Sequence, residues 1–332
     1  MEQTDTKLRV GIIGIGHLGR IHAGLWQRIE GAVLSGVFDV DQEKAAAEAA
    51  VLGCTAFDSV GELLENVDAV TIASPTSTHF EIAAQCLQAG KHCLIEKPIT
   101  ATYAEAQELL KIVEQTGLVV QVGHVERFNP VLEALRDYEP KPMFIEAHRL
   151  AQFKPRATDV SVVHDLMIHD IDIVLWLVKD TVESIDASGV AVLTSTPDIA
   201  NARLRFRNGC VANLTASRMS VKQMRKIRLF QKNAYISLDL GNTTVDVFRI
   251  REEDERDSAV PAMMLGQIDE GTHKRNIVYE QPEVLSANAI LGEQDAFTRA
   301  ILNGAPIPVT AAEGAEALRI AEEIAAMVEH RA

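Results

Sequence analysis

The stretch from residue 164 to residue 172 reads HDLMIHDID and carries side chains suited to proton transfer. If it is helical, Asp165 and His169 share one face and lie about 6 Å apart along the axis. A neutral imidazole accepts a proton from an alcohol near neutral pH, and a neighbouring carboxylate orients and tunes it. The spacing therefore predicts an acid–base pair, with Asp172 further along the same face.

Two other interpretations of this cluster stay open. Capping aspartates and hydrogen-bonded histidines are common in helices that do no chemistry. Asp165, His169 and Asp172 also have the side chains of metal ligands, although no cysteine or second histidine joins them at helical spacing. Taken alone, the cluster does not choose among proton transfer, metal binding and a structural role.

Lys97 is the second candidate for chemistry, in the tripeptide Glu96-Lys97-Pro98 at the end of an apolar run. Pro98 biases Lys97 towards an extended backbone. The ammonium would then project from the carboxyl edge of a parallel sheet, where ligands of open α/β folds bind. The alternative is a solvated surface charge.

Gly14, Gly16 and Gly19 follow an apolar strand and open a helix, which predicts a dinucleotide-binding turn. Gly14 permits the tight turn, Gly16 lets the backbone approach a pyrophosphate, and Gly19 lets the helix pack on the strand. Asp39 ends the second strand, where its carboxylate accepts hydrogen bonds from ribose hydroxyls and repels a 2′-phosphate. Since no arginine follows closely, NAD is favoured over NADP. The alternative is a glycine-rich turn that binds nothing.

These candidates must be positioned by a two-domain α/β chain. Up to about Val125, short β-branched runs alternate with helical stretches, as in a parallel sheet of βαβ units. Beyond it, the pattern indicates an α+β domain with a mainly antiparallel open sheet. We therefore expect a Rossmann dinucleotide-binding domain over residues 1–124 and an α+β domain over residues 125–332, to which the family resemblance described below assigns substrate binding and oligomerisation. Helices are expected at Asp41–Leu52, Ser77–Ala89, Thr102–Gln115, Val162–Val178, Asn288–Leu302 and Ala311–Glu329, with a helix-like stretch at 127–138 and strands at Phe144–Leu150, Ala202–Phe206 and Lys226–Leu240.

Composition limits the partners and the compartment. The chain of 332 residues has 32 Lys and Arg against 47 Asp and Glu, a net charge of −15, so nucleic acids and acidic membranes are poor partners. Its four cysteines form no C-x-x-C pair, which argues against a cysteine zinc cluster and favours a reduced, cytoplasmic setting. No apolar run is long enough to cross a bilayer, so we expect neither secretion nor anchoring.

Several motifs, in order along the chain, resemble the Gfo/Idh/MocA family of sugar and polyol oxidoreductases. They are Gly14 to Gly19, Ser74-Pro75 with His79, Gly90-Lys91-His92, Glu96-Lys97-Pro98, Arg127-Phe128, Asp165-x-x-x-His169-x-x-Asp172 and Gln294 to Ile301. The resemblance implies that Lys97, Asp165 and His169 surround the carbinol of the substrate. It also implies that Arg127 faces the substrate and that NAD is held by the glycines, His17, Leu18, Asp39, Ser74, Pro75, Thr76, His79, Glu96 and Lys97. Thr76 departs from the asparagine of many members.

Within the family, the stretches VGHVERFNP and HRLAQFKPRATDVSVVHDLMIHDID are most similar to enzymes that oxidise the C3 hydroxyl of UDP-N-acetylglucosamine. In those enzymes the ketone passes to a partner aminotransferase in lipid A biosynthesis. Arg149, Lys154 and Arg156 precede the Asp165/His169 segment, and we expect this basic group to contact the substrate pyrophosphate. A polyol or free-sugar dehydrogenase of the inositol or glucose type is the alternative enzyme. A non-catalytic NAD-sensing regulator is the alternative from another class of protein. Such a regulator needs neither Lys97 nor His169, and this chain retains both.

The resemblance also implies a homodimer or homotetramer in which second-domain sheets pack face to face. Leu204 and Phe206 alternate with Arg203, Arg205 and Arg207, which gives this strand an apolar and a basic face. We expect the basic face to be solvated or turned to another subunit.

Overall fold

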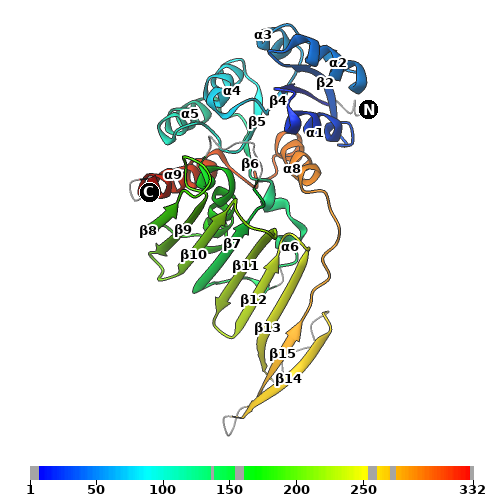
Figure 1. The fold of residues 1–332 in the computed structure, drawn as a ribbon. Helices are drawn as coiled ribbons and strands as arrows, with labels where there is room; N and C mark the ends of the chain where they lie inside the picture. The colour runs from blue at the N-terminus through cyan, green and yellow to red at the C-terminus, as the bar shows by residue number, and fades with distance from the viewer. Residues whose placement is uncertain (1–6, 136–137, 154–160, 253–259, 270–273, 330–332) are drawn as a thin grey trace, which may run out of the picture. The chain divides into compact units, whose positions relative to one another are not determined.

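The computed structural model describes residues 7–135, 138–153, 161–252, 260–269 and 274–329. The chain divides into two compact units. The first comprises Met1–Phe128 and Asn288–Arg319, and the second comprises Asn129–Ala287 and Ile320–Ala332. Figure 1 shows the helices and strands of each unit, coloured along the chain. Among the helices of the described ranges, none combines the length and the apolar character that a bilayer-spanning segment needs.

A six-stranded parallel sheet forms the centre of the first unit, with the strand order β3-β2-β1-β4-β5-β6. This is the strand order of a dinucleotide-binding Rossmann fold, so the predicted fold class is confirmed. The strands are β1 (Leu8–Ile13), β2 (Ala32–Phe38), β3 (Thr55–Ala56), β4 (Ala69–Ile72), β5 (His92–Glu96) and β6 (Val120–Gly123). The helices between them are α1 (His17–Trp26), α2 (Gln42–Leu52), α3 (Val60–Glu65), η1 (Thr76–Thr78), α4 (His79–Gln88) and α5 (Tyr103–Thr116).

Local capping explains where these helices begin and end. The Asp41 side chain accepts a hydrogen bond from the Lys44 N–H and starts α2. Thr102 and Glu105 form a reciprocal capping box at the start of α5. Gly53 and Gly117 end the same two helices in the left-handed region, where glycine has no Cβ penalty. The expected helices at Asp41–Leu52, Ser77–Ala89 and Thr102–Gln115 are therefore confirmed, apart from the short η1 turn that begins the second of them.

The boundary expected at residue 124 differs from the division in the structure. The chain returns to the first unit with α8 (Ala289–Asn303) and the first part of α9 (Ala311–Glu329). The Phe297 ring is fully buried and meets Trp26 of α1 edge to face, with 6.3 Å between the ring centroids. Leu318 is buried in the same hydrophobic cluster as Ile72 of β4 and Ile95 of β5. Hydrophobic burial, which no local pattern reveals, assigns these C-terminal helices to the N-terminal sheet.

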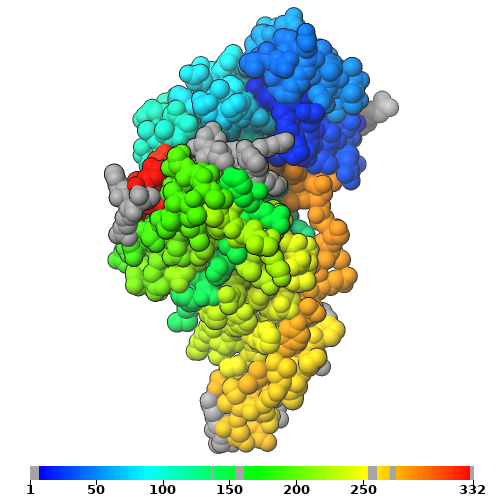
Figure 2. Space-filling view, viewed as in Figure 1, coloured from blue at the N-terminus to red at the C-terminus, as the bar shows by residue number. Residues whose placement is uncertain are grey.

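A nine-stranded sheet dominates the second unit, with the order β14-β15-β13-β12-β11-β7-β10-β9-β8. Its neighbouring strands pair antiparallel except β7 and β10, which confirms the mainly antiparallel sheet. Strands β14 and β15 lie at one end of this strand order, and their atoms are coloured yellow to orange in Figure 2. The strands are β7 (Phe144–Leu150), β8 (Val182–Val190), β9 (Ile199–Phe206), β10 (Val211–Ser217), β11 (Met224–Gln231), β12 (Ala234–Asp239), β13 (Thr244–Glu252), β14 (Ala262–Asp269) and β15 (Lys274–Glu280).

Helical structure in the middle of the chain is shorter than the pattern suggests. The helix expected at Val162–Val178 consists of a π-helical turn, Val163–Met167, followed by α7 (Ile168–Val178), which packs on β7 and β10. The helix-like stretch from residue 127 yields only η2 (Val125–Phe128) and α6 (Pro130–Glu133) in the described residues. The expected run Lys226–Leu240 is a hairpin, since Asn233 adopts a positive φ of 65° between β11 and β12.

Candidate functional site

The cofactor-binding candidates of the first unit gather at one edge of the parallel sheet. Gly14 directly follows β1, Asp39 follows β2, Ser74 lies two residues beyond β4, and Glu96 ends β5. The carboxyl ends of parallel strands meet at a common edge, where open α/β sheets bind ligands. The structure therefore brings these residues and Lys97 together, as the sequence predicts.

The glycine-rich turn has the geometry that a dinucleotide requires. Gly14 has a φ of +91°, and a Cβ there would lie 2.6 Å from the Ser74 nitrogen. A Cβ on Gly19 would lie 1.9 Å from the Gly14 oxygen. The first turn of α1 therefore packs against the turn after β1 at a distance that only glycine permits. Gly16 is the N-cap of α1, and no atom lies within 4 Å of the place that a Cβ would take there, so its backbone is open to approach by a phosphate. His17 and Leu18, in the first turn of α1, are exposed. These features fit NAD.

Asp39 has more partners than the sequence indicates. Its Oδ2 accepts hydrogen bonds from the Ile15 N–H at 2.7 Å and from Lys44 Nζ at 3.2 Å, and its Oδ1 accepts one from the Asp41 N–H at 3.0 Å. Burial raises the pKa of Asp39, but the two backbone donors and Lys44 outweigh it, and the pKa is lowered from its ordinary value. The carboxylate is therefore held as an anion.

His79 connects two parts of this edge. The ring is 1% exposed, its Nε2 lies 3.0 Å from the Ser74 carbonyl oxygen, and its Nδ1 lies 2.9 Å from the Pro98 carbonyl oxygen. Both nitrogens are therefore engaged with backbone, and the expectation that His79 contacts the cofactor gives way to a positioning role. Pro75 is exposed and Thr76 half-buried in the turn that His79 holds.

Glu96 anchors the strand end that carries Lys97. Its Oε2 accepts the Lys97 backbone N–H at 3.1 Å, and its Oε1 lies 2.8 Å from His22 Nε2. The other ring nitrogen of His22 faces the Gln294 amide nitrogen at 3.2 Å. The buried His22 and Gln294, together with the half-buried Glu96, fix the backbone on which the Lys97 ammonium depends.

The acid–base candidates lie in the second unit, at the junction of the π-helical turn and α7. Asp165 belongs to the turn and His169 to the first turn of α7, and both are half-buried. Single π-turns inside helices occur frequently at functional sites. Asp172 is 1% exposed. Within the described residues, no group of three or more His, Cys, Asp and Glu side chains is arranged to hold a metal ion.

Two arginines expected at the substrate are occupied inside the protein. Arg149 is 4% exposed and pairs with Asp170 through two hydrogen bonds, Nε to Oδ2 at 3.0 Å and Nη2 to Oδ1 at 2.8 Å. The Arg127 side chain is 3% exposed and its Nη1 lies 3.0 Å from Glu313 Oε1. Buried, paired guanidinium groups of this kind hold elements together, so we correct the substrate-contact assignment of both. Lys154 and Arg156 lie outside the described residues.

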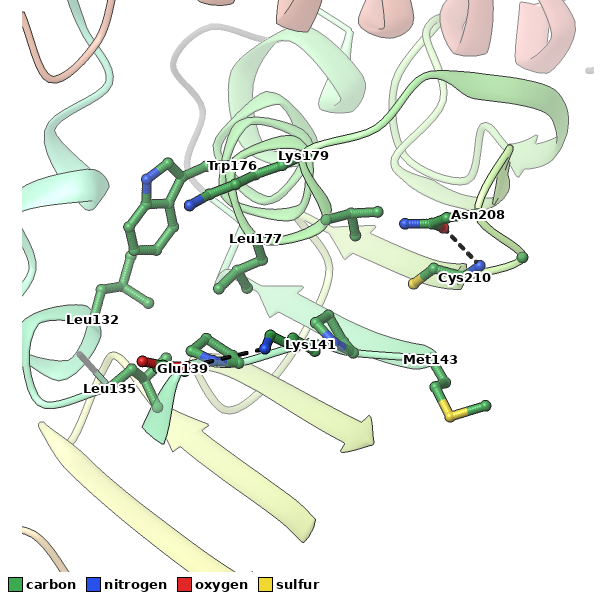
Figure 3. A pocket seen from close by; sticks show the side chains of 14 residues that line it. Leu132, Leu135, Glu139, Lys141, Met143, Trp176, Leu177, Lys179, Asn208 and Cys210 are labelled. Carbon is green, nitrogen blue, oxygen red and sulfur yellow. Dashed lines mark hydrogen bonds and ion pairs between the residues drawn. The ribbon is translucent and has the colours of Figure 1, made fainter. Parts of the chain in front are cut away.

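A cavity of about 760 Å³ lies in the second unit at the far end of α7 from His169. Figure 3 shows Trp176 and Lys179 of this helix end above Lys141 and Met143. Leu132, Leu135 and Leu177 add to its mostly apolar lining. None of the residues predicted for the site lines it.

Two family models match consecutive parts of the chain. Residues 8–124 match the model of the oxidoreductase family with an NAD-binding Rossmann fold, and residues 135–237 match the GFO/IDH/MocA C-terminal domain. A UDP-N-acetylglucosamine 3-dehydrogenase from Acidithiobacillus ferrooxidans is 46% identical over 242 residues, which cover 73% of this chain and 77% of the relative. The chain belongs to the Gfo/Idh/MocA oxidoreductase family. The predicted family, an enzyme of the dehydrogenase type, and NAD as its cofactor are thereby confirmed.

A solved structure and a more distant sequence relative support the same family assignment. The crystal structure of UDP-N-acetylglucosamine 3-dehydrogenase from Acidithiobacillus ferrooxidans superposes with a TM-score of 0.87 at 38% identity, covering 98% of this chain and 99% of that one. A myo-inositol 2-dehydrogenase from Thermotoga maritima is a more distant relative, 27% identical over 72% of this chain and 77% of its own length.

Sequence reasoning missed several residues of this edge. Lys44 lies five positions after Asp39, and only the first turn of α2 brings it back to that carboxylate. His22 lies 272 positions from Gln294, which the sequence offers only as the start of a family motif, and Glu293 beside it belongs to no local motif. An acidic residue within the apolar pattern of α8 was the available signal for Glu293.

Proposed function

We propose that this protein uses NAD to oxidise the C3 hydroxyl of UDP-N-acetylglucosamine to a ketone. The observation that carries the proposal is the 46% identity to a UDP-N-acetylglucosamine 3-dehydrogenase over 77% of the length of that enzyme. The stretch at residues 148–172 supports it, because it contains Asp165 and His169 together with basic residues suited to a nucleotide diphosphate. Lys97, in Glu96-Lys97-Pro98, completes the catalytic set.

Each proposed residue has one role. NAD, when bound, supplies the hydride acceptor. His169 removes the proton of the hydroxyl, and Asp165 orients the imidazole and keeps its tautomer. Lys97 donates a hydrogen bond to the same oxygen and stabilises the negative charge that develops on it. Asp39 accepts hydrogen bonds from the adenosine ribose, and the N-terminus of α1 receives the pyrophosphate.

The basic group that precedes the Asp165/His169 segment is proposed to select the nucleotide. With Arg149 and Arg127 occupied by carboxylates, Lys154 and Arg156 are the remaining residues of the predicted set for the pyrophosphate. The carbonyl carbon of a 3-keto sugar is an electrophile towards amines, so an aminotransferase is the enzyme class suited to consume it. We place the reaction in amino-sugar biosynthesis of the lipid A type.

An inositol or free-sugar dehydrogenase is the second candidate. It is favoured by the myo-inositol 2-dehydrogenase from Thermotoga maritima, which matches 72% of this chain at 27% identity. The same lysine, histidine and aspartate serve both reactions, so the substrate must be decided by experiment.

The deciding experiment is an NADH-formation assay with UDP-N-acetylglucosamine, free N-acetylglucosamine and myo-inositol. A glutamate-dependent aminotransferase is included to consume the ketone, so that product accumulation does not stop the oxidation. We expect turnover with the UDP-sugar and none with the other two. Equal rates with free sugar or inositol would decide for the second candidate.

A further inference from the structure

Glu293 is a buried carboxyl group to which the proposed chemistry assigns nothing. It lies on α8 of the first unit, is 0% exposed, and neither of its side-chain oxygens has a hydrogen-bond partner within the described residues. A bare carboxylate in such a place costs several kcal/mol, whereas a protonated carboxylic acid costs far less. Its position therefore needs an explanation.

The neighbours of Glu293 place it against the strand end that carries Lys97. Gln121 of β6 donates its side-chain N–H to the Glu293 backbone oxygen at 2.9 Å. The adjacent Gln294 donates its amide N–H to His22 Nδ1, which leaves the His22 Nε2–H to donate to Glu96. Glu96 also accepts the Lys97 N–H. Two carboxyl groups thus share one desolvated cluster.

The surroundings of the two carboxyl groups differ. Glu96 has two donors, and although burial raises its pKa, His22 and the Lys97 amide outweigh burial and lower the pKa from its ordinary value. Burial raises the pKa of Glu293 well above its ordinary value, and the charge of Glu96 raises it further. When two carboxyl groups meet in a dry site, the one with donors ionises and the other keeps its proton.

The other charged groups on elements packed against α8 have partners of their own. On α1, Arg20 pairs with Glu48 at 3.1 Å, and on η2, Arg127 pairs with Glu313 at 3.0 Å. Asp295 of α8 itself pairs with Arg299 at 3.1 Å. The remaining titratable side chains of these elements are His17 of α1 and the buried Glu126 of η2.

We propose that Glu293 is a positioning residue that stays protonated beside Glu96, so that Glu96 is the single negative charge holding His22 and the Lys97 backbone. Loss of the Glu293 proton places a second anion in the cluster. Repulsion between the two carboxylates then competes with the hydrogen bonds from His22 and the Lys97 amide. Because these bonds fix the strand end, the Lys97 ammonium loses its alignment.

The first test compares the pH dependence of stability in the wild type and Glu293→Gln, an uncharged variant of the same shape. Folded Glu293 keeps its proton while the unfolded chain releases it above its ordinary pKa of 4.5. Wild-type stability therefore falls as pH rises, until pH reaches the folded pKa. In urea unfolding, the wild-type unfolding constant should increase relative to that of Glu293→Gln by about tenfold per pH unit above about pH 5.

Two controls accompany this comparison. Asp295→Asn removes a solvent-accessible acid of the same helix. The ratio of the wild-type unfolding constant to that of Asp295→Asn should change little with pH over the same range. An infrared difference spectrum between wild type and Glu293→Gln near neutral pH should contain the carbonyl band of a protonated carboxylic acid. The proposal would be overturned if the ratio of the unfolding constants of wild type and Glu293→Gln were independent of pH. A carboxylate band in place of the acid band would also overturn it.

The second test concerns positioning of Lys97 and rests on the proposed function. Glu293→Gln should retain kcat near neutral pH and should shift the alkaline decline of kcat to higher pH, with KM unchanged. An alkaline decline that stays in place would overturn the positioning role. Absence of turnover of UDP-N-acetylglucosamine by the wild type would count against the proposed function, and the stability comparison, which uses no substrate, would still decide the protonation of Glu293.

Discussion

Lys44 Nζ lies 3.2 Å from Asp39 Oδ2, so the carboxylate that ends β2 has a cation beside it. The two side chains are 33% and 12% exposed, respectively. Asp39 repels a 2′-phosphate, while Lys44 attracts one, and the balance between them sets the preference for NAD over NADP. This pair was not apparent from the sequence, where Asp39 stood alone.

We expect Lys44→Ala to increase the preference for NAD over NADP by about two- to fivefold, the range for a partly exposed ion pair. Asp39→Ser should narrow or reverse the preference, because Lys44 is then free to meet the phosphate. Adding Lys44→Ala to Asp39→Ser should remove that gain. Dissociation constants of both cofactors, measured by calorimetry, check the cycle; a wild type that binds NADP more tightly would show that Asp39 does not act as proposed.

Lys97→Ala should lower kcat by about 10²- to 10³-fold, because a preorganised donor to the reacting oxygen is lost. Its affinity for NAD should stay within about twofold, since Lys97 is assigned to the substrate oxygen and the phosphates are held elsewhere. Steady-state kinetics and calorimetry of the same preparation separate the two effects. Full activity in this variant would favour the regulator interpretation.

His169→Ala should lower kcat by about 10²- to 10⁴-fold, the usual contribution of a general base. The residual rate should rise with pH as hydroxide replaces the imidazole. Asp165→Asn should lower kcat less than His169→Ala does, because the imidazole is still present. Profiles of kcat against pH for the three proteins test this assignment, and a residual rate independent of pH in His169→Ala would contradict it.

Arg149→Met should destabilise the protein by about 3–5 kcal/mol, because it leaves the buried Asp170 carboxylate without its paired guanidinium. Arg149→Met combined with Asp170→Leu should recover much of that loss. Arg9→Met is the matched control, since the Arg9–Asp68 pair is exposed by 49% and 39% and should contribute only about 0–1 kcal/mol. Urea unfolding measures the stability of all three variants. If Arg149→Met had normal stability and a raised KM for the UDP-sugar, Arg149 would be a substrate contact after all.

The open face of the second-unit sheet carries a ladder of aromatic rings. Phe230, Tyr235, Phe248 and Tyr279 follow one another across four strands, with centroids 5.0, 5.7 and 4.9 Å apart. All four are half-buried, whereas alternate residues such as Ile236 and Val247 are fully buried. We expect a second copy of the chain to cover this face. Tyr235→Glu combined with Phe248→Glu should shift the mass measured by light scattering towards that of a monomer, and a wild type that is monomeric at micromolar concentration would contradict this expectation.

Much of the site was predictable because its signals are local. The glycine turn, Asp39 and Lys97 follow apolar strands, and parallel strands bring their carboxyl ends to one edge whatever the helices between them. The alternation of Leu204 and Phe206 with three arginines was likewise confirmed, since the first two are buried, Arg205 and Arg207 are exposed, and Arg203 is half-buried. Period-two burial is a property of every strand with one covered face.

Only the tertiary structure decided which charged groups face one another. Arg149 precedes the Asp165/His169 segment and has a side chain suited to a phosphate, yet its partner is Asp170, 21 residues away and buried with it. Glu293 and Glu96 are separated by most of the chain, and α8 returns to the first unit to place them in one cluster. Pairing of charges depends on distance and on exclusion of water, and neither is written in the spacing of residues along a chain. The sequence by itself therefore determined the family, the strand edge and the residue types available for chemistry, while folding decided which of those residues are left to do it.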